Sequence, residues 1–245
     1  MYPDFNNTRQ TPPPYYGGSA VKTQTNSVMK KVYVRMTIGL LVSAFCALGV
    51  ASSEAALTFV FGNAIMRWGI LIAMLAMAFI IPARLYKMSS STVLILFLVY
   101  SALMGTWLSA IFVVYKMTAI VATFFITAGT FGAMSVYGYF TKADLSKMGS
   151  YLMMALFGLI IAMLVNMFMH SSTMGYIISI AGVLIFTGLT AWDTQQVKQL
   201  TAANLDPALT DKLATMGAMN LYLDFINLFL FILRIFGGNR DSTTM

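Results

Sequence analysis

Charged residues are scarce in this chain. They make up 9% of the 245 residues, whereas hydrophobic residues make up 59%, and the mean hydropathy is +0.78. Soluble domains carry about 25% charged residues. A soluble fold with so few charges could not cover its surface, so the composition excludes that class. It predicts an integral membrane protein whose main partner is the lipid bilayer.

Cysteine and histidine are almost missing. Cys46 is the only cysteine and His170 the only histidine, so an intramolecular disulfide is excluded. The two cannot supply the three or four nitrogen and sulfur ligands of a zinc site. A Gly-x-Ser-x-Gly elbow, a metal-binding His motif and a phosphate-cradling Gly loop are also missing from the sequence. We therefore expect no enzyme and no cofactor.

The net charge of +7 does not indicate a nucleic-acid partner, because the basic residues flank apolar runs instead of forming one patch. If the N-terminus is cytoplasmic, eleven of the 15 Lys and Arg residues fall on the inside, and four on the outside. The outside four are Arg67, Lys116, Arg234 and Arg240. An excess of basic residues marks the cytoplasmic side. The expected orientation in a bacterial inner membrane is therefore N-terminus cytoplasmic and C-terminus outside.

Long apolar runs fill most of the chain. A helix needs about 20 apolar residues to span a bilayer. Seven runs meet that length, at residues 32–52, 65–83, 93–115, 118–140, 151–170, 174–194 and 216–236. They predict an all-α bundle of seven transmembrane helices over residues 29–240. Residues 1–28 are expected to be a disordered polar tail, 241–245 a short C-terminal tail, and the segment between the last two runs the longest internal loop. Glycines in the fourth and sixth runs are expected at close helix contacts: Gly129, Gly132, Gly138, Gly182 and Gly188.

Asp224 lies about eight residues into the seventh run, in the segment NLYLDFINLFLFILRIF. A charge at such a depth costs roughly 3 kcal/mol, so the residue must face the protein interior or water, or take up a proton. Asn220 and Asn227 fall on the same helix face. This polar stripe indicates a centrally packed helix. Its polar side either lines a pathway or belongs to a buried network that only fixes the packing.

Asp193 ends the sixth run and is expected at the same depth as Asp224, with Thr190 on its face. Taken alone it could be a solvated residue at the helix end. As a pair, two carboxylates in a low-dielectric site share a proton over some pH range, and so sense pH. They would hold calcium only weakly, because Ca²⁺ takes 6–8 oxygen ligands. Arg84, at the end of the second run, is a candidate gating counter-charge or a plain anchor on the cytoplasmic side.

Two segments, GLTAWDTQQVK (188–198) and MNLYLDFINLFLFILRIFG (219–237), resemble the most characteristic parts of the Bax inhibitor-1, or lifeguard, family. Residues 127–160 are similar to its bacterial branch. The resemblance implies a seven-helix bundle with the last helix central, and a pH-sensitive calcium leak. It places the paired aspartates of the family at Asp193 and Asp224, and its latching arginine at Arg84.

A second function stays open beside the calcium leak. Some bacterial members resemble modulators of a membrane-bound protease, so the chain could be a regulatory interaction protein whose aspartates are structural. The pair could also suggest an intramembrane aspartyl protease. The Gly-x-Gly-Asp element of that family is missing, because Asp224 follows Leu-Tyr-Leu and Asp193 follows Thr-Ala-Trp.

Overall fold

The computed structural model describes residues 18–202 and 206–237, with side chains described for 25–200 and 206–237. Over these residues the chain is helical and contains no strand, and seven helices are long and apolar enough to cross a membrane. The predicted class, an all-α bundle of seven transmembrane helices, is confirmed. Most of the predicted N-terminal tail and all of the C-terminal tail lie outside the described residues. Residues 18–28 of that tail belong to the first helix.

The seven long helices are α1 (Gly18–Ala51), α3 (Ala64–Arg84), α4 (Ser90–Leu108), α6 (Met117–Phe140), α7 (Ser146–Met169), α8 (Ser172–Ala202) and α9 (Pro207–Phe236). Short turns connect some of them: α2 (Glu54–Leu57), the π-turn η1 (Thr58–Gly62), the 3-10 turn η2 (Leu85–Lys87) and α5 (Ile111–Val114). Successive long helices run in opposite directions. We call the end at which α1, α4, α7 and α9 begin the N-terminal end of the bundle.

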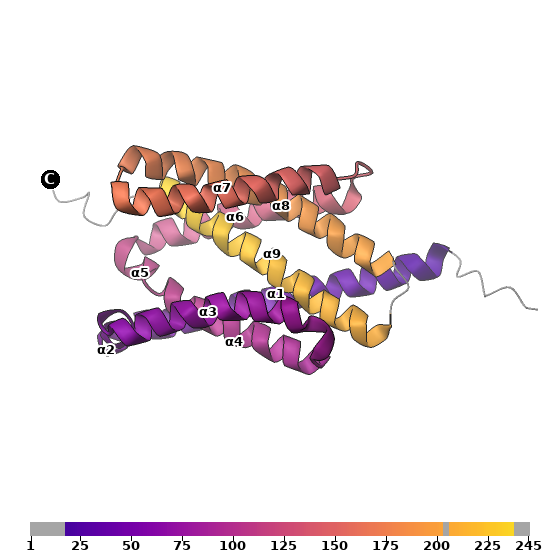
Figure 1. Ribbon diagram of the computed structural model, residues 1–245, viewed down its shortest axis with the longest axis horizontal. Helices are drawn as coiled ribbons and strands as arrows, with labels where there is room; N and C mark the ends of the chain where they lie inside the picture. Colours follow the sequence, from indigo (N-terminus) through magenta and orange to yellow (C-terminus); the bar gives the residue numbers. More distant parts are fainter. Residues whose placement is uncertain (1–17, 203–205, 238–245) are drawn as a thin grey trace, which may run out of the picture.

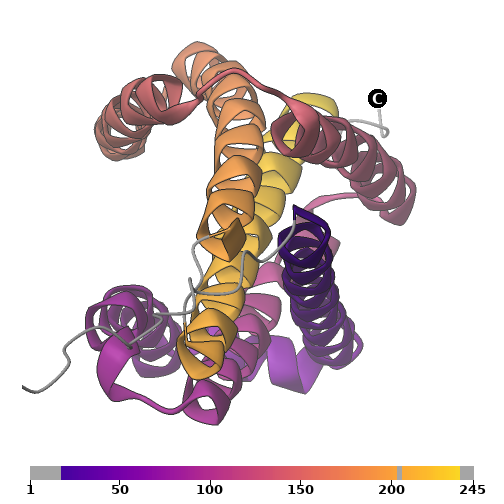
Figure 2. The same ribbon diagram turned by 90° about the vertical axis from the view of Figure 1, so that its right-hand side faces the viewer.

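The last helix forms the centre. It runs diagonally between α1, α3 and α4 on one side and α6, α7 and α8 on the other (Figure 1). It packs against α1, α4, α6 and α8. Of its most apolar stretch, 72% is buried, against 50% for α8 and 6% for α7. In the end-on view α8 crosses the middle beside α9, while α3 and α7 lie at the rim (Figure 2). The predicted central position of the last helix is confirmed.

The predicted long loop between the last two spans is wrong. Helix α8 continues to Ala202, and α9 begins at Pro207. The Asp206 carboxylate accepts hydrogen bonds from the first turn of α9, and proline is well suited to the first helical position because its missing N–H would have no partner there. Leucine, alanine, glutamine and lysine all favour helix in the extension of α8. Both helices therefore reach past the apolar runs at the N-terminal end.

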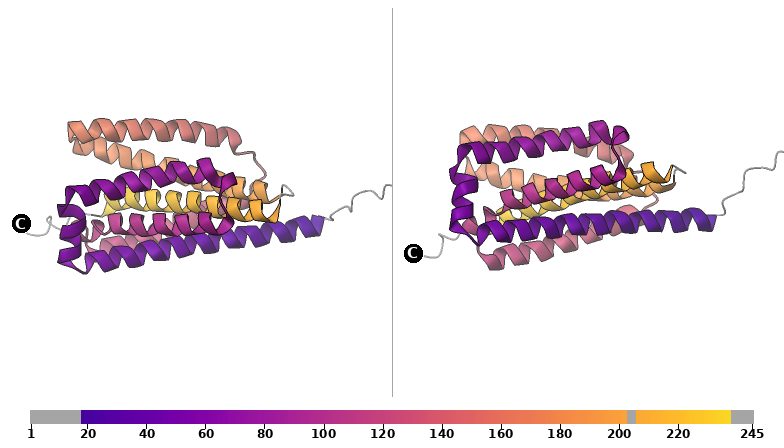
Figure 3. Two further views of the ribbon diagram at one scale, coloured as in Figure 1. Left: turned by 60° about the horizontal axis from the view of Figure 1, so that its bottom comes forward. Right: turned by 90° about the horizontal axis from the view of Figure 1, so that it is seen from below.

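Helix α1 is much longer than a membrane requires. Its 34 residues extend about 51 Å at 1.5 Å per residue, whereas the hydrocarbon core is about 30 Å thick. Figure 3 shows its first turns projecting beyond the other helices at the N-terminal end. Val28 and Met29, further along the helix, are buried and belong to the hydrophobic core.

Glycines allow some helices to touch through their backbones. A methyl group on Gly138 of α6 would overlap the backbone carbonyl of Ala191 in α8. A methyl group on Gly182 would meet the ring of Phe231, and one on Gly188 would meet Leu152. The expectation of close contact is confirmed for these three glycines. It is wrong for the two other glycines of α6, at positions 129 and 132, beside which a methyl group would meet nothing within 4 Å.

Candidate functional site

Asp224 lies in the middle of the bundle. Its side chain is 5% exposed, and the residues next to it, Phe225 and Ile226, belong to the hydrophobic core. Its Oδ2 atom is fully buried and has no hydrogen-bond partner among the described residues. An ionised carboxylate in such surroundings is costly, because buried apolar neighbours do not solvate its charge. The free energy of the folded state therefore depends strongly on whether the Asp224 carboxyl group carries a proton.

Asp193 on α8 lies directly against Asp224 on α9. The two carboxyl groups lie close enough to share a hydrogen bond when one of them carries a proton, and the Asp193 side chain is half-buried. Two carboxylates cannot hydrogen-bond each other, because neither has a donor; the contact requires a proton on one of them. The structure thus brings the two sequence-predicted acids together, and their geometry suits a shared proton.

The helix around Asp193 is held by unusually close contacts. Ala191, two residues before it, lies against Gly138 of α6, and the indole of Trp192 covers Gly149 of α7. Any side chain at either glycine would overlap α8, so both positions must stay small for α8 to come this close. These contacts fix the rotation of α8, and through it they hold the Asp193 carboxyl group toward α9.

Four buried side-chain polar atoms have no hydrogen-bond partner among the described residues: Ser135 Oγ, Trp192 Nε1, Thr194 Oγ1 and Asp224 Oδ2. One belongs to the aspartate pair, and two belong to the residues on either side of Asp193. Buried polar groups are nearly always paired, so each of these atoms calls for a physical explanation.

The side chains of the predicted polar stripe form hydrogen bonds mainly within their own helices. Thr190 is fully buried, and its hydroxyl donates to the Phe186 carbonyl at 2.8 Å. The side-chain nitrogen of Asn227 donates to the Leu223 carbonyl at 2.9 Å. Asn220 is half-buried. Each bond occupies a donor and leaves the side-chain oxygen lone pairs of Thr190 and Asn227 to serve as acceptors or cation ligands.

The structure does not bring Arg84 to the aspartate pair. Arg84 is the last residue of α3, a helix at the rim of the bundle, and its side chain is exposed. Among the described residues, the Arg84 side chain makes no hydrogen bond or ion pair; its backbone carbonyl accepts from Met88 N at 3.2 Å. An insertion of this guanidinium between the acids would require α3 to move inward. The gating role of Arg84 stays a prediction.

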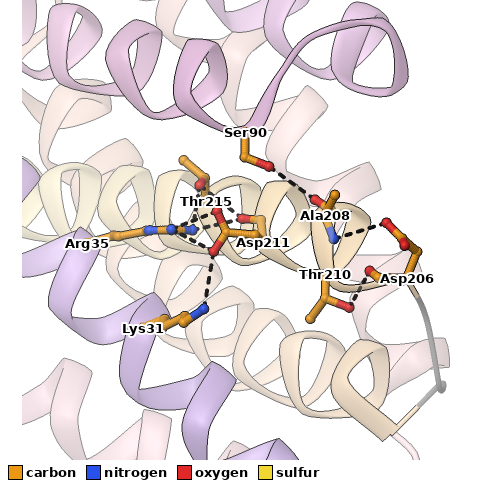
Figure 4. A network of polar contacts seen from close by, with 8 residues as sticks. All are labelled: Lys31, Arg35, Ser90, Asp206, Ala208, Thr210, Asp211 and Thr215. Atoms are coloured by element: carbon orange, nitrogen blue, oxygen red, sulfur yellow. Dashed lines mark hydrogen bonds and ion pairs between the residues drawn. The ribbon is translucent and has the colours of Figure 1, made fainter.

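The arginine that does meet an acid is Arg35, and the sequence pattern missed this pair. Its guanidinium binds both carboxylate oxygens of Asp211, at 2.8 and 2.9 Å, and also donates to the Asp211 carbonyl. The same group donates to Thr215 Oγ1 at 2.8 Å (Figure 4). Lys31 adds a longer contact of 3.4 Å to Asp211. This network joins α1 to α9 at the N-terminal end of the bundle.

Few metal-ligating side chains converge in the part of the chain that the structure describes. Over the described residues, no group of three or more His, Cys, Asp and Glu side chains converges. Calcium takes 6–8 oxygen ligands, so the Asp193–Asp224 pair alone is not a tight binding cage. The oxygens of Thr190 and Asn227 lie on the same helices and could add to the ligand set.

Comparison with known proteins gives a consistent result. A family model described as "Inhibitor of apoptosis-promoting Bax1" matches residues 25–241. The chain is 46% identical over 214 residues to the inner membrane protein YbhL of Escherichia coli strain K12, covering 86% of this chain and 92% of YbhL. A protein of Borreliella burgdorferi is 46% identical over 218 residues, covering 89% and 94%. The protein YrjE of Lactococcus lactis is 40% identical over 228 residues, covering 88% and 94%.

Proposed function

The chain belongs to the Bax inhibitor-1 family, and from this premise we propose that it is a pH-sensitive, calcium-permeable leak channel gated by the Asp193–Asp224 pair. It is an integral membrane protein. Its relative YbhL is named an inner membrane protein, and we assign this chain to the same membrane, with the N-terminus in the cytoplasm. The observation that carries the proposal is the contact between two carboxyl groups at the centre of seven apolar helices.

Protonation decides the state of the pair. With one proton shared, the two groups hydrogen-bond and link α8 to α9. Without that proton, two negative charges lie side by side, and at about 4 Å in an effective dielectric of about 20 they repel by roughly 4 kcal/mol. Either the helices separate or a cation enters between the carboxylates. Acidic pH therefore favours the closed pair, and higher pH favours cation entry.

Calcium is the permeating ion in this proposal, not a resident cofactor. The two carboxylates attract a divalent cation, and Thr190 and Asn227 offer further oxygens on the same two helices. Water must supply the rest of the 6–8 ligands. A site with so few protein ligands binds weakly, which suits an ion that must also leave.

Calcium flux into proteoliposomes over a pH series tests the proposal. We expect flux through the unmodified protein to rise with pH, and Asp224→Asn to lose this dependence because the amide cannot ionise. Asp193→Asn should behave in the same way, since the two acids act as one unit. Asp144→Asn is the matched control, because Asp144 is an exposed acid between α6 and α7. Equal flux from the unmodified protein and Asp224→Asn at every pH would refute the channel.

The projecting start of α1 favours a second candidate, a regulatory protein that engages a membrane-bound protease. The helix is about 51 Å long and the hydrocarbon core is roughly 30 Å thick, so several turns of α1 extend beyond the core and could contact a partner. Deletion of residues 1–24 is the clean test, because it removes the first turns of α1 and spares Val28 and Met29, which are buried. Lost capture of a membrane protease with unchanged calcium flux would favour this function. Capture that survives the deletion would count against it.

A further inference from the structure

A pocket of about 470 Å³ lies where α7 and α9 end and α8 begins, at the opposite end of the bundle from the N-terminal end. These helix ends come together at the left-hand side of Figure 1. The polar part of the pocket lining comes from all three helices and from the turn between α7 and α8: Asn166, His170, Ser171, Ser172 and Arg234. Such a lining at the end of a membrane-spanning bundle offers hydrogen-bond donors and positive charge to a ligand.

Two donor groups of this pocket lie close together. A β-carbon on Gly175 would lie 3.2 Å from Arg234 Nη2 and 3.4 Å from Asn166 Nδ2. Gly175 is buried in α8 and has no side chain, so the α9 guanidinium and the α7 amide meet above its backbone. Within the part of the chain whose side chains are described, neither group donates to an acceptor. Both can therefore donate to one ligand that carries acceptor oxygens.

The Asn166 amide is held in this direction by the turn between α7 and α8. Its Oδ1 atom accepts from Ser171 N at 3.2 Å, which leaves Nδ2 on the side of Arg234. His170 has a positive φ of 51°, and its backbone N–H donates to the Asn166 carbonyl at 2.8 Å, so α7 ends there and α8 begins after two residues. One donor is therefore oriented before a ligand arrives, which lowers the entropy cost of binding.

The positive charge of the pocket has no acid beside it. No Asp or Glu lines the pocket, and Glu54 of α2 is the one acid at this end of the described bundle. Glu54 forms no ion pair with Arg234 there. An arginine in the last turn of α9 is also favoured by the negative end of the helix dipole. That role does not account for the Asn166 amide beside the guanidinium, whereas an anionic ligand uses both groups.

The apolar lining indicates which kind of molecule carries the negative charge. Met163 and Met167 of α7 and Ile178 of α8 form the rest of the pocket wall. The neighbouring Phe168 is exposed, as is usual for an apolar side chain that contacts lipid. Lipid phosphates lie at the ends of membrane-spanning helices, and their acyl chains extend inward beside the helices. A lipid phosphate at Arg234 would place an acyl chain along the two methionines, a contact that a free phosphate lacks.

We propose that the pocket between the ends of α7, α8 and α9 binds the headgroup phosphate of an anionic phospholipid. The Arg234 guanidinium and the Asn166 amide donate to the phosphate oxygens, and an acyl chain lies along Met163 and Met167. A zwitterionic lipid brings an ammonium group that finds no carboxylate in the pocket and is repelled by Arg234, so the site prefers a lipid with net negative charge. Binding does not involve the aspartate pair, and it can be measured without any flux.

Lipid titration of the purified protein in detergent, read by native mass spectrometry, tests the site. The probes are anionic dioleoyl phosphatidylglycerol, zwitterionic dioleoyl phosphatidylcholine and inorganic phosphate, each in a separate titration. We expect phosphatidylglycerol to bind more tightly than phosphatidylcholine. Arg234→Met should weaken the binding of phosphatidylglycerol roughly tenfold, because it removes charge-assisted hydrogen bonds to the phosphate.

A second variant and a matched control define the result. Asn166→Asp keeps an acceptor for Ser171 N but replaces the amide donor with a carboxylate, which pairs with Arg234 and competes with the phosphate. It should also weaken phosphatidylglycerol binding roughly tenfold, and it serves as the test if Arg234→Met fails to fold. Arg67→Met is the control, because Arg67 is exposed at the same end of the bundle and lies outside the pocket. It should leave the affinity unchanged.

Each other outcome overturns the lipid site. Equal phosphatidylglycerol affinity in the unmodified protein and Arg234→Met would show that the pocket does not bind the phosphate. An equal loss from Arg67→Met would show only a general attraction to basic residues at this surface. Equal affinity for the two lipids would reject the preference for an anionic headgroup. Binding of inorganic phosphate that depends on Arg234, without lipid binding that does, would replace the lipid with a small soluble anion.

Discussion

Removal of the Arg35 guanidinium tests how firmly α1 is fastened to α9. The guanidinium donates four hydrogen bonds, three to Asp211 and one to Thr215. The side chains of Arg35 and Asp211 are 16% and 25% exposed. Exposed ion pairs contribute 0.2–1 kcal/mol, whereas breaking a buried pair costs about 3–5 kcal/mol. The partial exposure places Arg35→Met between these limits, at about 2 kcal/mol of lost stability.

The assay is thermal unfolding in detergent at one fixed scan rate, because irreversible unfolding makes the midpoint depend on the rate. For a chain of this length, about 2 kcal/mol lowers the midpoint by roughly 4–8 °C. Asp211→Asn should lower it by a similar amount. The double variant should lose little more than Arg35→Met alone, since both changes remove the same ion pair.

Lys31→Met is the matched control. Its contact with Asp211 is longer, at 3.4 Å, and its side chain is 55% exposed, so the change should stay within about 0.5 kcal/mol. Two results would refute the reasoning. One is additivity of Arg35→Met and Asp211→Asn in the double variant; the other is an equal loss from Lys31→Met.

Three further predictions follow from contacts between helices. Gly138→Ala should cost about 1–3 kcal/mol of stability, because the methyl group meets the α8 backbone, whereas Gly132→Ala meets open space and should stabilise by up to about 1 kcal/mol in the same unfolding assay. Gln195→Leu removes two hydrogen bonds to the α6–α7 connection and should speed its proteolysis; unchanged cleavage would contradict this. Tyr222→Phe leaves the Ser43 hydroxyl with one partner fewer and should cost about 1 kcal/mol, measured as a lower unfolding midpoint; no change would show that bond to be unimportant.

The sequence predicted the features that depend on local pattern. Apolar runs of membrane length gave the seven spans, and an acid within such a run, Asp224, marked the helix with a polar face. The aspartate pair followed from depth: α8 ends and α9 begins at the same end of the bundle, so Asp193 and Asp224 had to lie at similar heights. Helix periodicity also predicted that Thr190 and Asn227 share helix faces with the acids, and this stays a prediction.

The features that depend on rotation and tilt were missed. Arg35 and Asp211 are 176 residues apart, and no local pattern says which basic residue on one helix faces an acid on another. Arg84 was chosen as a counter-charge by its place at a helix end and by the family resemblance, and the peripheral position of α3 keeps it away from the pair. The sequence did contain a signal for the early start of α9. Asp206-Pro207 is typical of a helix N-terminus, but a hydropathy profile does not detect it.

Helix α9 is central and is synthesised after the other six spans, so its position affects how the bundle assembles during biosynthesis. The most buried span is also the last to be made, so the six earlier spans cannot complete their packing until translation is nearly finished. A nascent chain that stops short of α9 would enter the bilayer lacking its axis, and with it Asp224. Truncated products would remain loosely assembled, which marks them for quality-control proteolysis.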